Sequence, residues 1–289
     1  MKISAFSVCA PEYDVRGTIE VLKELGYDAV EWRTTNMPPI SKPDTYNIQN
    51  RYWSYNLSTV DINRIDEIAD EIGIMCKNAG LEICSFSTYL NQNNIDDINK
   101  VANAANIAGC KNIRLALPGY NKNENYRTQF NRAIKEVQPL EKIADRYKVR
   151  INFEMHPGNI IPSASAAYRF VSNFDPKYLG VIYDPGNMIF EGYEDYRMGI
   201  ELLGEYLAYV HIKNAAWKHE GFTKDGAWIW KPSNAPTKRG CADLPGLINI
   251  LKEKDYEGYL SIEDFSNEED TYTKLKNNLE YLKKLTSNK

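Results

Sequence analysis

Four residues with metal-binding or proton-transferring side chains stand at the ends of four apolar runs that are typical of buried β-strands. They are Glu154 in INFEM, Asp184 in VIYDPGN, His211 in YVHIKN and Glu263 in SIED. Any one of them alone fits a hydrogen-bonded strand end, but four at matched positions favour a common site. Three carboxylates and one imidazole suit a hard or borderline divalent cation, such as Mn²⁺, Mg²⁺, Co²⁺ or Zn²⁺. Because a cation would also offset the repulsion among the acids, the pattern predicts one divalent-metal site.

Other side chains near these strand ends are candidates for contacting a substrate. His156 follows Glu154 by two positions, so both point to the same face of the strand. His156 lies further out, and we expect it to contact a substrate oxygen rather than the metal. Trp32 ends an earlier apolar run and Trp217 lies beyond His211. We expect both indole rings to lie against the substrate.

The segments that must position these residues alternate between strand-like and helix-like patterns. Amphipathic stretches such as TIEVLKELGY carry apolar residues at helical spacing and contain a glycine near their end. Eight strand–helix units favour a closed (β/α)₈ TIM barrel over an open sheet, and no GxGxxG motif follows the first strand. Active sites of such barrels lie at the carboxyl ends of the strands, where the candidate ligands stand. The predicted strands cover 2–8, 28–33, 82–88, 112–118, 149–155, 179–184, 208–214 and 258–264.

Two long segments interrupt this rhythm within what we predict to be a single domain of residues 1–289. Residues 34–58 are rich in Pro, Tyr and Asn, and residues 215–242 are rich in Trp, Gly, Pro and Lys. Connections of this length usually form lids or are disordered. Their aromatic residues fit contacts with a substrate, but they fit ordinary packing or a homo-oligomer contact equally well.

The composition excludes several classes of protein. The chain has 289 residues, is 43% hydrophobic and 26% charged, and carries a formal net charge of −4. It has no basic block, which disfavours nucleic-acid binding, and no apolar run near the roughly 18 residues of a membrane helix. The N-terminus reads as a strand and not as a signal peptide. The five cysteines form no CxxC pair. Reduced thiols and a cytoplasmic location are therefore the simplest expectation.

The order of these motifs along the chain resembles the sugar phosphate isomerase/epimerase superfamily of xylose isomerase-like barrels. This superfamily includes D-tagatose 3-epimerase, hydroxypyruvate isomerase and inosose dehydratase, with AP endonuclease as a distant relative. The resemblance implies that Glu154, Asp184, His211 and Glu263 bind one metal, and that Glu154 and Glu263 act as acid and base. The matching motifs are GYDAVEWR, INFEMHPG, VIYDPGN, YVHIKN and DLPGLINILKEKDYEGYLSIED.

The resemblance is incomplete at two substrate-contacting positions. Asn187 stands where the epimerases often carry a histidine, and Trp217 stands where they often carry an arginine. Asn187, Lys213 and His156 are expected to supply the oxygen contacts instead. This departure places ketose 3-epimerase activity in doubt. AP endonuclease activity is also disfavoured, because a three-metal site needs many histidines and this chain has three.

The expected activity is isomerisation or epimerisation of a sugar, inositol or related polyhydroxy carbonyl compound. A carboxylate removes a C–H proton, the metal stabilises the resulting enediolate, and the proton returns to the opposite face or to the neighbouring carbon. With a leaving hydroxyl on the next carbon, the same site would act as a keto-polyol dehydratase. A non-catalytic carbohydrate-binding barrel is the alternative from another class.

Overall fold

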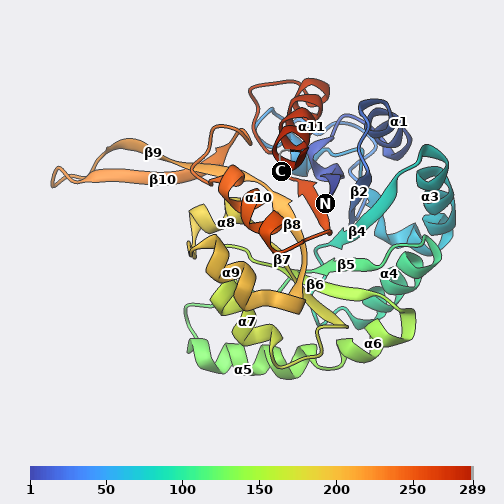
Figure 1. The fold of residues 1–289 in the computed structure, drawn as a ribbon, viewed down its shortest axis with the longest axis horizontal. Coiled ribbons are helices and arrows are strands. Elements are labelled where there is room, and N and C mark those ends of the chain that lie inside the picture. Colours follow the sequence, from blue (N-terminus) through green and yellow to red (C-terminus); the bar gives the residue numbers. More distant parts are fainter. Residues whose placement is uncertain (288–289) are drawn as a thin grey trace.

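Eight parallel strands form a closed barrel in the computed structural model, which describes residues 1–287 (Figure 1). Each strand pairs with its neighbour in the order β1, β2, β4, β5, β6, β7, β8, β11, and β11 pairs back onto β1. The closed circuit confirms the predicted (β/α)₈ barrel, and each predicted strand is present. The barrel strands are β1 (Lys2–Phe6), β2 (Ala29–Thr35), β4 (Glu82–Thr88), β5 (Asn112–Leu115), β6 (Arg150–Glu154), β7 (Leu179–Tyr183), β8 (Leu207–Ile212) and β11 (Tyr259–Ile262). The short β3 (Val60–Asp61) pairs in parallel with the end of β2.

Helices surround the barrel and connect successive strands (Figure 1). Their ends follow the local sequence: α1 begins after Asp14, whose carboxylate accepts from the Gly17 amide, and ends at Gly26 with a φ of 85°. The helices are α1 (Val15–Leu25), α2 (Arg51–Ser54), α3 (Ile65–Ala79), α4 (Ile95–Ile107), α5 (Tyr126–Val137), α6 (Leu140–Tyr147), α7 (Ala164–Val171), α8 (Pro185–Phe190), α9 (Tyr196–Leu203), α10 (Leu244–Glu253) and α11 (Thr271–Ser287). Among the described residues, no helix has the length and apolar character that crossing a membrane requires.

Alternation along the strands divides their side chains between two environments. On β2, Val30 and Trp32 belong to the main hydrophobic cluster with apolar residues of the surrounding helices. Glu31 instead bonds to Ser87 and Tyr209, on other strands of the barrel. The outer layer therefore supplies the apolar core, whereas the barrel interior is polar toward the carboxyl ends of the strands.

A two-stranded antiparallel hairpin projects from the barrel, where residues 215–242 were expected to form a long loop. Its strands are β9 (Asn214–Phe222) and β10 (Trp228–Ala235), and Figure 1 shows them extending well beyond the helices. The turn contains Asp225-Gly226, and Gly226 has a φ of 83°. An Asp-Gly turn between segments rich in aromatic residues is a hairpin signal, so this element was readable from the sequence.

Candidate active site

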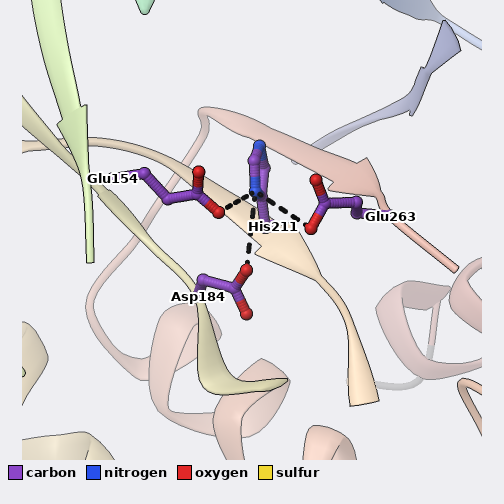
Figure 2. Close-up of side chains that lie close together, drawn as sticks. All are labelled: Glu154, Asp184, His211 and Glu263. Carbon is purple, nitrogen blue, oxygen red and sulfur yellow. Dashed lines mark hydrogen bonds and ion pairs between the residues drawn. The ribbon is translucent and has the colours of Figure 1, made fainter. Parts of the chain in front are cut away.

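The four predicted ligands converge at the carboxyl end of the barrel (Figure 2). Glu154 ends β6, Asp184 follows β7, His211 lies near the end of β8, and Glu263 follows β11. Each offers one nitrogen or oxygen atom, and these four atoms all lie within 4.8 Å of one another. All four side chains are buried. Barrel closure thus brings together residues that are more than 100 positions apart in the chain.

The distances from His211 to the three carboxylates are compatible with a shared metal ion. His211 Nδ1 lies 3.2 Å from Glu154 Oε1, 3.7 Å from Asp184 Oδ2 and 3.9 Å from Glu263 Oε2. Ligand atoms that each sit about 2.1 Å from one ion are separated from one another by roughly 3 to 4 Å. Asp184 Oδ2 is buried and has no hydrogen-bond partner. A buried carboxylate oxygen of this kind fits a cation, so the cluster could bind a metal.

Two cations balance part of the negative charge of the cluster. Arg114 Nη2, from β5, lies 2.5 Å from Glu154 Oε2, and Lys213 Nζ lies 2.7 Å from Glu263 Oε2. Burial opposes ionisation of Glu154, but Arg114, His211 and Lys213 together hold its pKa well below the usual range. Burial raises the pKa of Glu263, and Lys213 offsets this only in part. The two glutamates therefore occupy different electrostatic environments.

A buried carboxylate holds the far side of the His211 ring. Glu31 Oε2 lies 3.2 Å from His211 Nε2, and Glu31 also accepts hydrogen bonds from Ser87, Tyr209 and Ser261. Burial opposes charge on His211, but Glu31 and Glu263 raise the pKa of the imidazole well above its usual value. The surroundings therefore favour positive charge at this point, as a cation site requires.

A pocket of about 290 Å³ lies over the cluster. Glu154, Glu263 and Lys213 are part of its wall, so the acids face space that a substrate can enter. This volume is close to the lower end of the range for small-molecule sites, roughly 300 Å³, and suits a compact polar substrate. Aromatic and loop residues complete the wall, among them Trp53, Tyr89, Phe265, His156 and Asn159.

The five residues predicted to contact a substrate lie in different parts of the structure. His156 and Lys213 line the pocket. Asn187 is buried on α8 and donates hydrogen bonds to Glu154 Oε1 at 2.9 Å and to the Met155 carbonyl, so it orients a candidate ligand. The remaining two, Trp32 and Trp217, are not part of the pocket wall.

The positions of the two tryptophans follow from their strands. Trp32 is fully buried, and alternation on β2 turns it toward the helices because Glu31 points into the barrel. Trp217 lies on the projecting β9 and is exposed. Neither indole is part of the wall of this pocket, so their contact with a substrate stays a prediction from the sequence.

Three residues of the site were missed or left without a role from sequence. Arg114 lies in NIRLALP, where a charged residue inside an apolar strand was a usable signal of a buried partner. Glu31 carried the same signal within AVEWR. Tyr89 follows β4 and packs against the Arg114 guanidinium, 5.4 Å from its ring centre, a contact with no local sequence pattern.

The chain belongs to the xylose isomerase-like TIM barrel family, whose model matches residues 19–285. Curated relatives include inosose dehydratases. That of Bacillus velezensis is 28% identical over 131 residues, and this chain spans only 43% of that relative's length. That of Bacillus cereus is 22% identical over 272 residues, which cover 83% of this chain and 89% of the relative. The resemblance to this family is confirmed.

Solved structures show the same fold across nearly the whole chain. The IOLI protein with a binding zinc atom aligns with a TM-score of 0.72 and 15% identity, covering 99% of this chain and 98% of its own. The 3-keto-D-glucoside 4-epimerase YcjR from E. coli aligns with a TM-score of 0.71 and 18% identity, covering 98% and 99%. At these identities the likeness shows the fold alone.

Proposed function

We propose that this chain is a divalent-metal-dependent isomerase or epimerase of a sugar, inositol or related polyhydroxy carbonyl compound. The observation that carries the proposal is the convergence of Glu154, Asp184, His211 and Glu263 on one point at the wall of a pocket. A purely binding barrel has no need of two buried glutamates beside such a centre. Sugar epimerases and inosose dehydratases among the similar proteins support the same class of chemistry.

In this proposal, the two glutamates transfer the proton on opposite sides of a bound substrate. Glu154 and Glu263 approach His211 from opposite sides in Figure 2, and both line the pocket. One carboxylate removes the proton next to the substrate carbonyl, and the other returns it to the opposite face or to the adjacent carbon. A divalent cation held by Glu154, Asp184, His211 and Glu263 would polarise the carbonyl and stabilise negative charge on the substrate oxygens.

Neighbouring side chains orient these acids and neutralise charge. Asn187 holds Glu154 Oε1 and Arg114 holds Glu154 Oε2, so this carboxylate is restrained at both oxygens. Lys213 faces the pocket beside Glu263, where its ammonium group can donate to a substrate oxygen that gains negative charge. We assign His156, an exposed residue of the pocket wall, to an outer hydroxyl of the substrate.

Proton exchange with solvent is the direct test. The metal content of the purified protein is measured first, and the protein is then incubated in D₂O with a panel of ketoses, aldoses and inososes. One divalent ion per chain and deuterium at the carbon next to the carbonyl are expected. Glu154→Gln and Glu263→Gln should each reduce exchange at least 100-fold. Glu201→Gln, on the exposed face of α9, is the matched control and should exchange normally. Metal-loaded protein that exchanges no proton from any compound in the panel would refute the proposal.

Dehydration of a keto-polyol is the second candidate, favoured by the inosose dehydratases among the relatives. After proton removal, loss of a hydroxyl from the next carbon needs a proton donor. Three basic side chains line the pocket: Lys213, His156 and Arg114. Of these, Lys213 and His156 are the candidate proton donors. Mass spectrometry separates the two reactions, because isomerisation leaves the substrate mass unchanged and dehydration removes one water.

A further inference from the structure

Two buried arginines enter the barrel at the same level, on either side of β4. Arg33 of β2 and Arg114 of β5 both pair in register with Ser87 of β4, so the two side chains share a face of the sheet. Each arginine is only 8% exposed. Their guanidinium carbons lie 5.7 Å and 5.4 Å from the centre of the Tyr89 ring, which follows β4. Tyr89 therefore contacts both cations.

Arg33 has no counter-charge within the chain. Its guanidinium donates to the Thr59 hydroxyl, and its Nε is buried without a hydrogen-bond partner. Within residues 1–287, no carboxylate lies at ion-pair distance from this side chain. Buried charges are normally paired, because their transfer out of water is costly. An unpaired guanidinium beside a pocket thus indicates that an anion from outside the chain completes the site.

Arg114 brings the same excess of positive charge to the pocket wall. It lines the pocket together with Lys213, and its Nε is also buried without a hydrogen-bond partner. The anionic partners of Arg114 and Lys213 are Glu154 and Glu263, which are both candidate metal ligands. A divalent ion shared by these acids would neutralise much of their charge. The two cations would then face the pocket with less compensation than in the metal-free chain.

We propose that the substrate of this site carries a carboxylate, which binds to Arg114 on the pocket wall. Arg33 is not part of the wall, but it adds positive charge from the other strand that flanks Tyr89, in surroundings where water screens little. This inference rests on the function proposed above and narrows its substrate class to a polyhydroxy carbonyl acid. A planar carboxylate matches the donors of a guanidinium, and this match is lost when arginine is replaced by lysine.

The size of the pocket favours a carboxylate over a phosphate. Its volume is about 290 Å³. A carboxylate in place of a terminal hydroxymethyl group adds a single oxygen atom to a sugar, whereas a phosphate ester adds a whole further group. The smaller anion therefore leaves more of the pocket for the polyhydroxy carbonyl part of the molecule.

Isothermal titration calorimetry on the full chain loaded with Mn²⁺ tests this subsite with matched ligands. D-fructuronate is compared with D-fructose, and D-glucuronate with D-glucose, so that each pair differs only at the terminal carbon. At least one carboxylate should bind about 10- to 100-fold more tightly than its neutral partner, as hydrogen bonds to a charged group do. Equal or weaker binding of both carboxylates would overturn the proposal. Tighter binding of D-fructose 6-phosphate than of D-fructuronate would overturn the assignment to a carboxylate.

Variants of the two arginines test which side chains carry the preference. Arg114→Lys and Arg33→Met should each weaken binding of the preferred carboxylate about 10-fold and leave binding of its neutral partner unchanged. Arg33→Lys should recover part of the loss, because it restores the charge. Arg132→Met, at an exposed arginine of α5, is the matched control and should bind as the wild type does. Equal losses for the carboxylate and the neutral sugar in Arg33→Met would show a structural role and contradict the proposal.

The same ligands in D₂O separate this inference from the proposed function. A carboxylate that binds preferentially but exchanges no proton would support the anion subsite and count against the isomerase. Proton exchange in neutral sugars, without any preference for carboxylates, would support the isomerase and overturn the anion subsite. Circular dichroism checks that every variant is folded.

Discussion

Glu31 and His211, 180 positions apart in the sequence, are in contact inside the barrel at 3.2 Å between Oε2 and Nε2. The contact leaves Nδ1 of the same ring directed at Glu154, Asp184 and Glu263. A carboxylate that holds the second nitrogen of a metal-binding histidine sets the orientation of the ring and increases its basicity. Glu31 is thus a positioning residue for the candidate metal centre.

Replacement of Glu31 should weaken metal binding without unfolding the barrel. Glu31→Gln keeps the shape and retains hydrogen bonding but removes the charge next to His211. We expect the affinity for Mn²⁺ or Zn²⁺, measured by isothermal titration calorimetry, to fall about 10- to 100-fold. Glu82→Gln changes a half-exposed carboxylate at the amino end of β4, and this variant should bind the metal as tightly as the wild type does. Unchanged affinity in Glu31→Gln would show that the ring is held by packing alone.

Arg114 should stabilise the metal-free protein more than the metal-bound protein. It lies 2.5 Å from Glu154 and both are buried, so Arg114→Met leaves a buried carboxylate without its main cation. Loss of one partner of a buried pair costs about 3 kcal/mol of unfolding free energy. Bound metal would offset the charge of Glu154, so the variant should lose less unfolding free energy when metal is present. Urea unfolding with and without Mn²⁺ measures both values, and an equal loss in the two states would contradict the explanation.

Metal removal should lower the thermal stability of the wild type. A ligand present at 100 times its dissociation constant stabilises the folded state by about 2.7 kcal/mol. A chelator should therefore lower the Tm of metal-loaded protein by several degrees, as followed by differential scanning calorimetry.

Asp184→Asn provides the matched variant for this experiment. Asp184 Oδ1 accepts from the Asn187 amide at 2.8 Å and caps α8, and an asparagine oxygen can keep that bond. The variant loses only the charge of the candidate ligand. Its Tm should hardly respond to the chelator, whereas a response equal to that of the wild type would exclude Asp184 from the metal centre.

Thiol reactivity should distinguish one cysteine from the other four. Cys9, Cys76, Cys84 and Cys110 are buried, whereas Cys241 is exposed. Burial raises the pKa of the Cys76 and Cys110 thiols to about 12, so they hold almost no thiolate at neutral pH. Ellman's reagent should titrate one thiol per native chain and five after denaturation. Cys241→Ser should abolish the native reaction, and rapid reaction of more than one thiol would show that the barrel opens.

The sequence by itself determined the barrel and the four members of the candidate centre. Repeating strand and helix patterns identify each unit, since they depend on local spacing of apolar residues. Parallel strands place their carboxyl ends at one rim, so Glu154, Asp184, His211 and Glu263 could be grouped without coordinates.

Only the tertiary structure decided how other side chains relate to that centre. Alternation along β2 divides Glu31 from Trp32, but which of the two faces inward depends on closure of the barrel. The pairs between Glu31 and His211 and between Arg114 and Glu154 also arise from contacts between strands. The position of Trp217 on an extended hairpin, outside the wall of the pocket, depends on pairing of β9 with β10. Local periodicity specifies elements, whereas contacts between distant elements depend on how the whole barrel packs.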